Sequence, residues 1–342
     1  MPKKILIVGQ GITGSVLALT LHHAGVEVYI ADQLQLKSAS SIAAGVINPV
    51  TGKRYVKSWG FDTFYPFAKD FYQKIAVAAQ QPIWFDYPIV RLLGSTLEQN
   101  DWNLRVGRPD YEGFTDVAMH AGEWQGLAHP NYGFGVIHQS ARVDFSAVCS
   151  YVQRFFSSRN RFLDKHITLE NISTYLPDFE HIIFCEGYYG AQNELFKGIP
   201  WLSAKGDRLL IRLHTDRVIH SMLKKQIMLV PYGAGVYWAG ANYYWDFEDT
   251  DPSQTGLDFI QEELATMLHV GYDLVDHSAA VRPVAKDRRP IIGWSKDNPK
   301  IGIFNGMGSK GALLTPYWAA HFAQHILDGI SINKEVDIMR FG

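Results

Sequence analysis

The apolar positions at the start of the chain form two short continuous runs joined by a helical pattern. Residues 5–8 are all apolar and end at Gly9, a helical pattern follows Gly14, and residues 28–31 lead to Asp32. Short apolar runs of this kind are typical of strands buried on both faces, as in a parallel sheet. The chain is therefore predicted to begin with a strand, a helix and a second, parallel strand.

Two later segments have the same character and indicate a return to this unit. Residues 181–185 form another buried-strand pattern before Gly187, and residues 301–304 form a strand that a glycine-rich turn joins to a helix over residues 312–327. Parallel strands are joined by long crossovers, so segments far apart in the chain can lie side by side in one sheet. One sheet built from the start, the middle and the end of the chain is predicted.

Between these segments the pattern changes to the alternation that is typical of antiparallel strands. The region from 82 to 138 is rich in loops and short strands, and residues 205–244 alternate between apolar and polar positions. The strands predicted in these regions are residues 89–93, 208–212, 227–231 and 236–240. Helices are predicted over residues 62–80 and 255–268 and from residue 145 toward 156, the last with Asp144 or Ser146 as its N-cap.

The predicted fold class is α/β, or α+β over the whole chain, with two interleaved domains. A Rossmann-like nucleotide-binding domain is predicted from residues 1–74, 142–206 and 276–342. A mainly antiparallel β-sheet domain for the substrate is predicted from residues 75–141 and 207–275. A length of 342 residues favours two domains, because single cores rarely grow to that size.

The first predicted turn carries a dinucleotide-binding fingerprint. Its sequence, Gly-Gln-Gly-Ile-Thr-Gly from Gly9 to Gly14, matches G-x-G-x-x-G between a strand and a helix. Gly9 permits the tight turn, Gly11 lets a pyrophosphate approach the helix N-terminus, and Gly14 lets the helix pack on the strand. Asp32 follows about 20 residues later, where a carboxylate can accept ribose hydroxyls. A dinucleotide site is predicted here, with contacts at Gly9, Gly11, Ile12, Thr13, Gly14, Asp32 and Gln33.

The overall composition narrows the class of protein. Apolar residues make up 47% of the chain and charged residues 19%, as in a well-packed globular protein. The formal net charge of −2 gives no general attraction to nucleic acid or to an anionic membrane. Two cysteines in 342 residues favour a reducing compartment, and no apolar stretch reaches the roughly 20 residues of a membrane helix. The protein is expected to be soluble and cytoplasmic, with no metal site.

Four separated motifs resemble a known family. They are the fingerprint from Gly9 to Asp32, the segment 41–46 (Ser-Ile-Ala-Ala-Gly-Val), the strand end Cys-Glu-Gly at 185–187, and a C-terminal block over 281–293 and 304–311. With these motifs the chain resembles the FAD-dependent D-amino-acid oxidase superfamily, nearest the glycine and sarcosine oxidase branch. The resemblance runs from end to end and is weakest between residues 82 and 138.

The resemblance implies FAD as the cofactor, in place of NAD. The turn from Gly306 to Gly311 would lie along the pyrimidine edge of the isoalloxazine, where N–H groups and a helix N-terminus stabilise negative charge. The alternative is a tight strand-to-helix turn without this role. Sarcosine oxidases attach FAD to a Cys near this turn, and this chain has none there, so non-covalent FAD is expected. The further residues assigned to FAD are Ser40, Ser41, Ala44, Gly45, Val46, Ile167, Cys185, Gly187, Gly306, Met307, Gly308, Ser309, Lys310 and Gly311.

The resemblance also implies the chemistry, which is hydride transfer from the carbon bearing the amine to the flavin N5, giving an imine. Arg282, in the pattern Ala-Val-Arg-Pro, corresponds to the Arg that binds the amino-acid carboxylate in glycine oxidases. The alternative is a structural Arg paired with Asp287 or Glu186. A second Arg of the glycine-oxidase pattern is missing, and Lys310 stands nearby with a charge but without the fork geometry. No protein base is assigned.

Several questions stay open at the level of the sequence. Aromatic residues Tyr232, Tyr243, Tyr244 and Trp245 are candidates for the walls of the substrate pocket, with sheet packing as the alternative. The turn at 306–311 also resembles the oxidase half of the bifunctional enzymes that mature 5-methylaminomethyl-2-thiouridine in tRNA. A carboxymethylaminomethyl group on a tRNA uridine is therefore an alternative substrate, less favoured than a small-molecule amine. A flavin-binding protein without turnover is a further alternative. The electron acceptor, oxygen or another, and the oligomeric state are left open.

Overall fold

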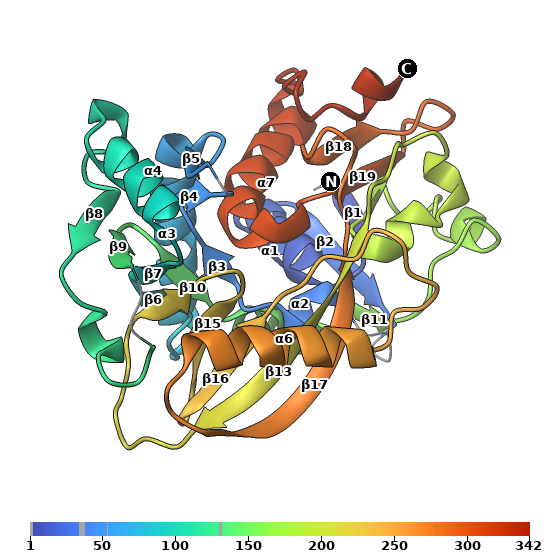
Figure 1. Ribbon diagram of the computed structural model, residues 1–342. Coiled ribbons are helices and arrows are strands. Elements are labelled where there is room, and N and C mark those ends of the chain that lie inside the picture. Colours follow the sequence, from blue (N-terminus) through green and yellow to red (C-terminus); the bar gives the residue numbers. More distant parts are fainter. Residues whose placement is uncertain (1–2, 34–37, 53, 130–131) are drawn as a thin grey trace.

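A six-stranded sheet forms the centre of one half of the molecule. The computed structural model describes residues 3–33, 38–52, 54–129 and 132–342 (Figure 1). The sheet has the order β11 (Phe162–Asp164), β2 (Glu27–Asp32), β1 (Lys4–Val8), β12 (His181–Phe184), β19 (Ile301–Asn305) and β18 (Ile291–Trp294). All neighbours pair in parallel except β18, which is antiparallel to β19. The predicted sheet from the start, middle and end of the chain is confirmed.

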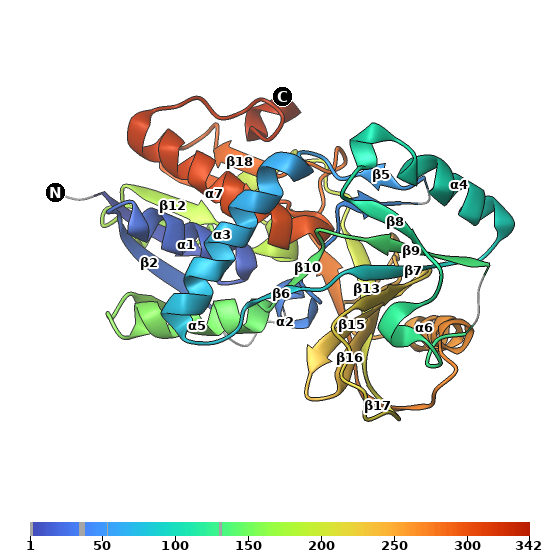
Figure 2. The ribbon, with the colours of Figure 1, turned by 90° about the vertical axis from the view of Figure 1, so that its left-hand side faces the viewer.

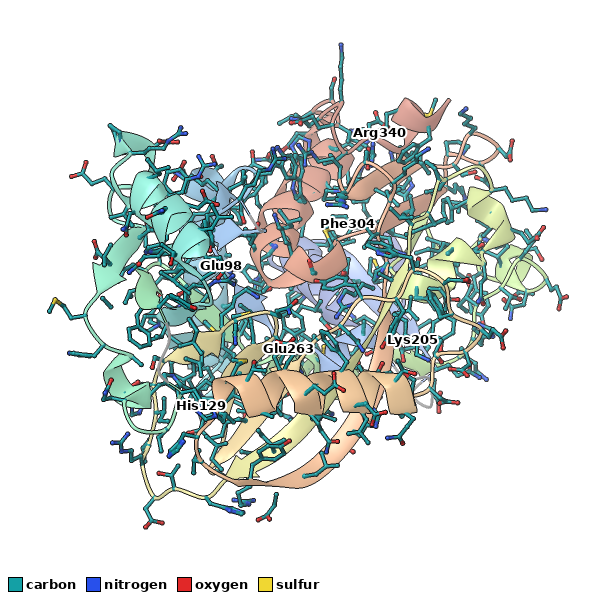
Figure 3. All side chains as sticks on the ribbon, in the orientation of Figure 1. Glu98, His129, Lys205, Glu263, Phe304 and Arg340 are labelled. Atoms are coloured by element: carbon teal, nitrogen blue, oxygen red, sulfur yellow. The ribbon has the colours of Figure 1, made fainter. Side chains whose placement is uncertain are left out.

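Both faces of this sheet are buried, which explains the continuous apolar runs. Ile5 and Ile7 of β1 join the core cluster under α1 (Ile12–His23), whereas Leu6 and Val8 join a second cluster on the opposite face. Helix α7 (Gly311–Asp328) packs on α1, α3 (Phe61–Ala79) packs on α7, and α5 (Phe145–Ser157) lies beside α1 (Figure 2). Phe304 of β19, labelled in Figure 3, is fully buried and stacks on α7.

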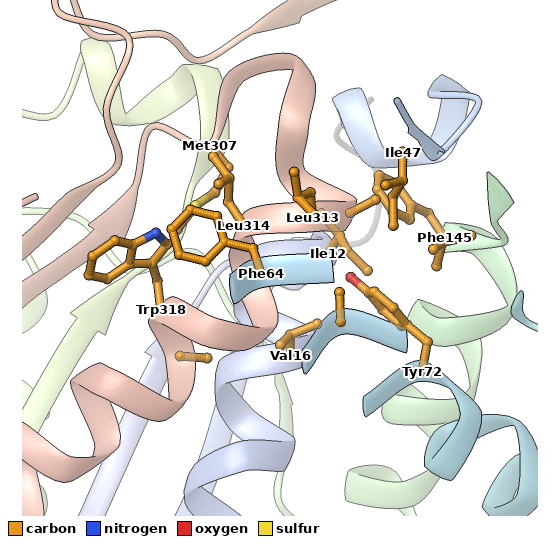
Figure 4. Packing of buried hydrophobic residues seen from close by; sticks show 14 of the residues in the cluster. Ile12, Val16, Ile47, Phe64, Tyr72, Phe145, Met307, Leu313, Leu314 and Trp318 are labelled. Carbon is orange, nitrogen blue, oxygen red and sulfur yellow. The ribbon is translucent and has the colours of Figure 1, made fainter. Parts of the chain in front are cut away.

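The contact between α1, α3 and α7 is made by large apolar side chains. Figure 4 shows Phe64 of α3 beside Trp318 of α7, with Val16 of α1 and Tyr72 of α3 in the same cluster. Tyr72 is fully buried, and burial raises the pKa of its hydroxyl far above the usual value. This layer fixes the N-terminal ends of α1 and α7, which both point toward the site described below.

An eight-stranded sheet forms the other half of the molecule. Its order is β17 (Tyr272–Arg282), β13 (Ala204–Leu213), β16 (Val236–Gly240), β15 (Met228–Gly233), β14 (Met222–Lys224), β7 (Ile89–Leu93), β9 (Gly133–Ile137) and β8 (Thr115–Ala118). Its neighbours are antiparallel except β14 and β7, which are parallel. Helix α6 (Gln254–Met267) covers one face (Figure 1), and the alternating residues of the opposite face point toward the six-stranded half.

Smaller elements connect the two halves. The short strands β3 (Val46–Ile47), β10 (Ala141–Val143) and β6 (Trp84–Asp86) form a three-stranded sheet, and β4 (Val50–Thr51) pairs with β5 (Val56–Lys57). Helix α2 (Ala39–Ile42) precedes β3, and α4 (Thr96–Val106) packs on β7, β8 and β9. Among the described residues, no helix combines the length and the apolar character that a membrane crossing requires.

Most predicted elements lie within a few residues of the observed ones. The helix predicted at 62–80 is α3, and Asp144 is the N-cap of α5, because its carboxylate accepts the N–H of Ala147 at 3.0 Å. The domain boundaries predicted at 74/75, 206/207 and 275/276 fall inside α3, β13 and β17. The division into two domains therefore stays a prediction, and at these points its boundaries cut through continuous elements.

Candidate functional site

A cavity of about 1550 Å³ lies between the two sheets. Its volume exceeds the roughly 300–1,000 Å³ that is typical of pockets for small ligands. One end is lined by the carboxyl ends of β1, β2 and β12, and the other by the free face of the eight-stranded sheet. Of the residues predicted to form the site, all but Gly14, Tyr232 and Tyr244 line this cavity.

The glycine fingerprint forms a tight turn at the nucleotide end of the cavity. Gly9 has a φ of +97°, and a Cβ there would lie 2.7 Å from the carbonyl oxygen of Cys185. A Cβ at Gly14 would collide with the Gly9 carbonyl, so Gly14 acts by packing and not by lining the cavity. Gly11 is the N-cap of α1 and has no side chain to cap the helix. The N-terminus of α1 is therefore free of any bulky group on the cavity side.

Two side chains hold this turn in place. Ser40 accepts the N–H of Ile12 at 2.9 Å, and the Asp32 carboxylate accepts the N–H of Gln10. Burial raises the pKa of Asp32, the Gln10 N–H lowers it, and the nearby Asp164 carboxylate raises it further. Asp32 lines the cavity at the end of β2, where it is placed to accept hydroxyl groups. Gln33 lines the cavity beside it, whereas residues 34–37 lie outside the described residues.

The segment after α2 brings backbone close to the cavity. Gly45 has a φ of +71°, and a Cβ there would collide with the carbonyl oxygen of Val143. The N–H of Val143 in turn donates to the Gly45 carbonyl at 2.9 Å. Ser41, Ala44 and Val46 line the cavity on the same segment. Gly45 therefore lets this segment pack closely against β10, while its neighbours line the cavity.

The C-terminal glycine turn lies beside the segment that follows β12. Gly306 and Gly308 have φ values of +75° and +56°, conformations that favour glycine. Asn305 joins the two motifs, because its side-chain amide donates to the Gly187 carbonyl at 2.9 Å and its side-chain oxygen accepts the N–H of Gly306 at 2.8 Å. Motifs more than 100 residues apart in the chain thus form one wall.

Lys310 supplies positive charge at this turn. It lines the cavity immediately before α7, and no carboxylate contacts it among the described residues. Burial lowers the pKa of Lys310, and the nearby Arg289 and Arg288 lower it further. Arg289 also lies 4.0 Å above the ring of Trp59, which lines the cavity as well. The turn therefore places the start of α7 beside Lys310, Arg288 and Arg289, of which Arg289 pairs with Glu335 at 3.5 Å.

Arg282 is the last residue of β17 and faces the cavity. Its guanidinium lies over Gly206, where any Cβ would collide with its nitrogens, and 4.3 Å above the ring of Tyr243. It donates a long hydrogen bond of 3.4 Å to the Asn242 carbonyl. Burial lowers the pKa of Arg282, while attraction to Tyr243 and Asp207 raises it. Because no carboxylate pairs with it among the described residues, the guanidinium is available to a ligand.

The alternative of a structural ion pair at Arg282 is not what the structure contains. Asp287 pairs with Arg340, at 2.7 Å between Oδ2 and Nε. Glu186 accepts the side-chain amide of Asn193 at 2.7 Å. Burial raises the pKa of Glu186 to about 7, and the Asn193 hydrogen bond offsets this in part. Glu186 lines the cavity, whereas the sequence indicates it only as an alternative partner for Arg282.

Arg282 is also tied to the C-terminal turn through the backbone. The carbonyl of the next residue, Pro283, accepts the N–H of Gly308 at 3.0 Å. The candidate carboxylate anchor and the glycine turn are therefore connected by one peptide unit and one hydrogen bond.

The four candidate aromatic residues separate into two groups. Tyr243 and Trp245 line the cavity, stack with ring centroids 6.3 Å apart, and are 52% and 50% exposed. Tyr232 instead packs against the guanidinium of Arg142 at 4.3 Å. Tyr244 pairs through its backbone with Lys205, labelled in Figure 3, at 2.9 Å in both directions. Tyr243 and Trp245 thus stand at a solvent-accessible edge of the cavity.

Sequence reasoning missed several residues on the free face of the eight-stranded sheet. Lys224, Met228 and Trp238 line the cavity there, together with Arg208. Alternation along β14, β15 and β16 assigns them to one face, but only the pairing of distant strands shows that this face meets the cavity. Further lining residues that were not predicted lie at 165–166, 168–170, 188–189 and 192–194 and at Phe145, Ser146 and Cys149.

Comparisons with known proteins agree with this geometry. Over residues 4–325 the chain matches the DAO family, described as FAD dependent oxidoreductase. It is 25% identical to the tRNA 5-methylaminomethyl-2-thiouridine biosynthesis bifunctional protein MnmC of Marinobacter nauticus, over 94% of this chain and 55% of that protein. The chain thus spans about half the length of this relative.

Solved structures show the same fold over nearly the whole chain. Iminodiacetate oxidase from Chelativorans superposes with a TM-score of 0.76 at 17% identity, covering 97% of this chain and 98% of that one. Glycine oxidase from Geobacillus kaustophilus superposes with a TM-score of 0.78 at 14% identity, covering 99% and 98%. The match to the family covers most of the chain. This match confirms the predicted α/β fold and the predicted FAD cofactor. The chain belongs to the DAO family of FAD-dependent oxidoreductases.

Proposed function

We propose that the chain oxidises a small amine that carries a carboxylate, an amino acid or an N-alkyl amino acid, to the corresponding imine. The single observation that carries the proposal is Arg282, a partly buried guanidinium without a carboxylate partner in the described structure, facing the cavity beside the C-terminal glycine turn. A planar guanidinium binds a carboxylate with two parallel hydrogen bonds, which fixes position and orientation.

The residues of the cavity fit FAD. The turn at Gly9 and Gly11, with the N-terminus of α1, would hold the pyrophosphate, and Asp32 the ribose of the adenosine. The turn from Gly306 to Gly311 would hold the pyrimidine edge of the isoalloxazine. FAD, when bound, accepts the hydride that leaves the carbon next to nitrogen.

The remaining steps fall to the residues of the chain. Arg282 binds the substrate carboxylate, so that the carbon bearing the amine lies at a fixed place beside the glycine turn. Lys310 supplies a second positive charge at that turn. Tyr243 and Trp245 shield the carboxylate from water on the exposed side. The amine loses one proton and the carbon one hydride, and water hydrolyses the released imine.

The test is anaerobic reduction of the flavin in the purified holoprotein. Absorbance of the oxidised flavin is followed while glycine, sarcosine, both proline enantiomers, other D-amino acids and a tRNA fraction are added in turn. Bleaching by a small carboxylated amine supports the proposal. The variant Arg282→Leu should keep FAD and raise the half-saturating substrate concentration about 100-fold, the loss expected for a charged hydrogen-bonded pair. Equal reduction rates in Arg282→Leu and wild type would contradict it.

A second candidate is the carboxymethylaminomethyl group of a modified tRNA uridine. It is favoured by the similarity to MnmC over 94% of this chain. Arg282 would hold the same kind of carboxylate in that substrate. Bleaching by the tRNA fraction alone, with an affinity that falls steeply with salt, would select this candidate. We propose oxygen, a quinone or a redox protein as the electron acceptor. Reoxidation of the reduced protein in air would identify oxygen.

A further inference from the structure

Lys224 stands on the face of the eight-stranded sheet that lines the cavity. It is the last residue of β14, and its neighbour across the sheet is Met228 of β15. Met228 pairs with Gly240 of β16, which pairs with Arg208 of β13. All four residues line the cavity. The Trp238 indole covers Gly240, since a Cβ there would lie 3.1 Å from Trp238 Cη2, and Lys224 stands at the far end of the row.

The ammonium group of Lys224 has no counterion in the part of the chain that is described. No hydrogen bond or ion pair joins it to a described residue, and Arg91 lies beside it on the neighbouring strand β7. Burial lowers the pKa of Lys224 to about 8, and the charge of Arg91 lowers it further. Burying a cation without a partner is costly, so such a group marks a place where an anion binds. The adjacent Lys225 differs, since its Nζ donates to Thr266 Oγ1 at 3.1 Å.

Charge is unevenly distributed along the cavity. The carboxylates that line it among the described residues are Asp32, Glu170, Glu186 and Glu194, which end or follow strands of the six-stranded sheet. The charged side chains that the eight-stranded sheet contributes to the cavity are all cations. Of these, Arg208 pairs with Asp276 at 3.0 Å. Arg282 and Lys224 are therefore the two cations on this face that lack a carboxylate partner among the described residues.

We propose that Lys224 binds a second carboxylate of the substrate, so that the enzyme prefers amines with two anionic groups. This inference rests on the proposed function, in which Arg282 holds the first carboxylate. Strands β17 and β14 are four steps apart, which corresponds to about 19 Å in a flat sheet with a spacing of about 4.8 Å, and Arg282 also lies four residues, or about 13 Å, along β17 from Ser278, which continues the row of Lys224. The two long side chains shorten the gap between the charges. The second carboxylate is thus carried on an extended arm and not on the neighbouring carbon.

The experiment uses holoenzyme and a matched series of secondary amines. N-(ω-carboxyalkyl)glycines with two to five methylene groups in the arm are each compared with the analogue in which an isopropyl group replaces the second carboxylate. Anaerobic flavin reduction gives the half-saturating concentration for each compound. At the arm length that reaches Lys224, the dianionic compound should saturate at a concentration at least 10-fold lower than its analogue.

Variants at position 224 separate charge from packing. Lys224→Met should abolish the preference and leave the half-saturation of the monoanionic analogues within 2-fold of wild type. Lys224→Arg should retain most of the preference, and Lys225→Met, the control on the adjacent residue, should behave as wild type. Bound FAD, measured by absorbance, shows that each variant is folded, and Lys224→Gln replaces Lys224→Met if the latter lacks FAD.

Three results would overturn the proposal. One is the absence of any preference for dianions at every arm length in wild type. Another is an equal rise in the half-saturating concentrations of mono- and dianionic compounds in Lys224→Met. The third is a preference for dianionic amines that survives in both Lys224→Met and Lys224→Gln. If no amine reduces the flavin, the proposed function fails, and thioether analogues with sulfur in place of nitrogen then test Lys224 alone. Their binding, read from the flavin spectrum, should favour the dicarboxylate in wild type only; equal binding overturns the proposal.

Discussion

The guanidinium of Arg282 lies directly over Gly206, so that position 206 has no room for a side chain while the guanidinium stays in place. The two residues belong to neighbouring strands, β17 and β13, and Gly206 pairs with Ala280, two residues before Arg282. The absence of a side chain on one strand therefore sets the direction of a charged side chain on the next.

Gly206→Ala should move Arg282 without unfolding the protein. The atoms that a new Cβ would meet belong to the end of a flexible side chain, which can shift. Because small displacements of a positioning group are costly for a reaction, the half-saturating concentration of a carboxylated amine should rise about 10- to 100-fold. Steady-state kinetics with the substrate found in the reduction screen measures this, alongside the melting temperature. Unchanged kinetics would show that Arg282 does not hold the substrate in this position.

Gly11→Val should give protein with little or no FAD. A branched side chain at the N-cap of α1 would fill the space beside the helix N-terminus, and a Cβ alone lies 3.0 Å from Ser40 Oγ. The ratio of flavin to protein absorbance after purification, followed by titration with FAD, measures the loss. Gly107→Val is the matched control, since Gly107 is an exposed helix-boundary glycine with a φ of −73°, close to the −69° of Gly11, and its Cβ position meets only the Asn103 carbonyl oxygen, at 3.6 Å. A yellow, active Gly11→Val protein would refute the assignment of the pyrophosphate site.

Glu186 should make the stability of the protein depend on pH. Burial raises its pKa to about 7 from an ordinary value of 4.5, so the native state holds a proton that the unfolded state loses. This contribution is complete below pH about 4.5 and is lost as the pH rises through about 7. Urea unfolding at a fixed FAD concentration should show a loss of up to about 3 kcal/mol across this range.

Glu186→Gln should flatten that dependence. The amide keeps the shape and the hydrogen-bonding capacity of the neutral acid but does not titrate. Glu262→Gln, on the exposed side of α6, is the control and should leave the profile as in wild type. An identical slope in wild type and Glu186→Gln would assign the pH dependence to other groups.

The two cysteines should be unreactive in the native protein. Burial raises the pKa of Cys149 to about 11 and that of Cys185 well above its ordinary value, and the thiolate is the reactive form. At pH 8, a disulfide reagent such as dithionitrobenzoate should modify neither thiol in the holoprotein and both in urea. Rapid modification of the native protein would mean that the cavity around Cys149 opens frequently.

The sequence predicted the parts of the structure that local pattern determines. The run at residues 5–8, the glycines from Gly9 to Gly14 and the helix with Asp144 as N-cap depend on neighbouring residues, and each has the expected conformation. Residue type and spacing predict these features because capping and tight turns depend on residues close together in the chain. Burial of a strand on both faces likewise shows as a continuous apolar run.

The substrate side was harder to predict, since it depends on which strands become neighbours. Strands β14 and β7 are parallel and more than 120 residues apart, so nothing near Lys224 in the sequence indicates that it borders a cavity. Tyr232 shows a related effect. Alternation along β15 gives it the same face as Met228, but Arg142 covers its ring, and that contact is visible only in the fold.

The hydrogen bond from Gly308 to the Pro283 carbonyl has a consequence for regioselectivity. If Arg282 holds the carboxylate and the turn holds the flavin, as proposed, we expect oxidation at the carbon next to the carboxylate. An amine whose nitrogen stands one carbon farther along, as in β-alanine, would bind with its reactive C–H bond out of reach.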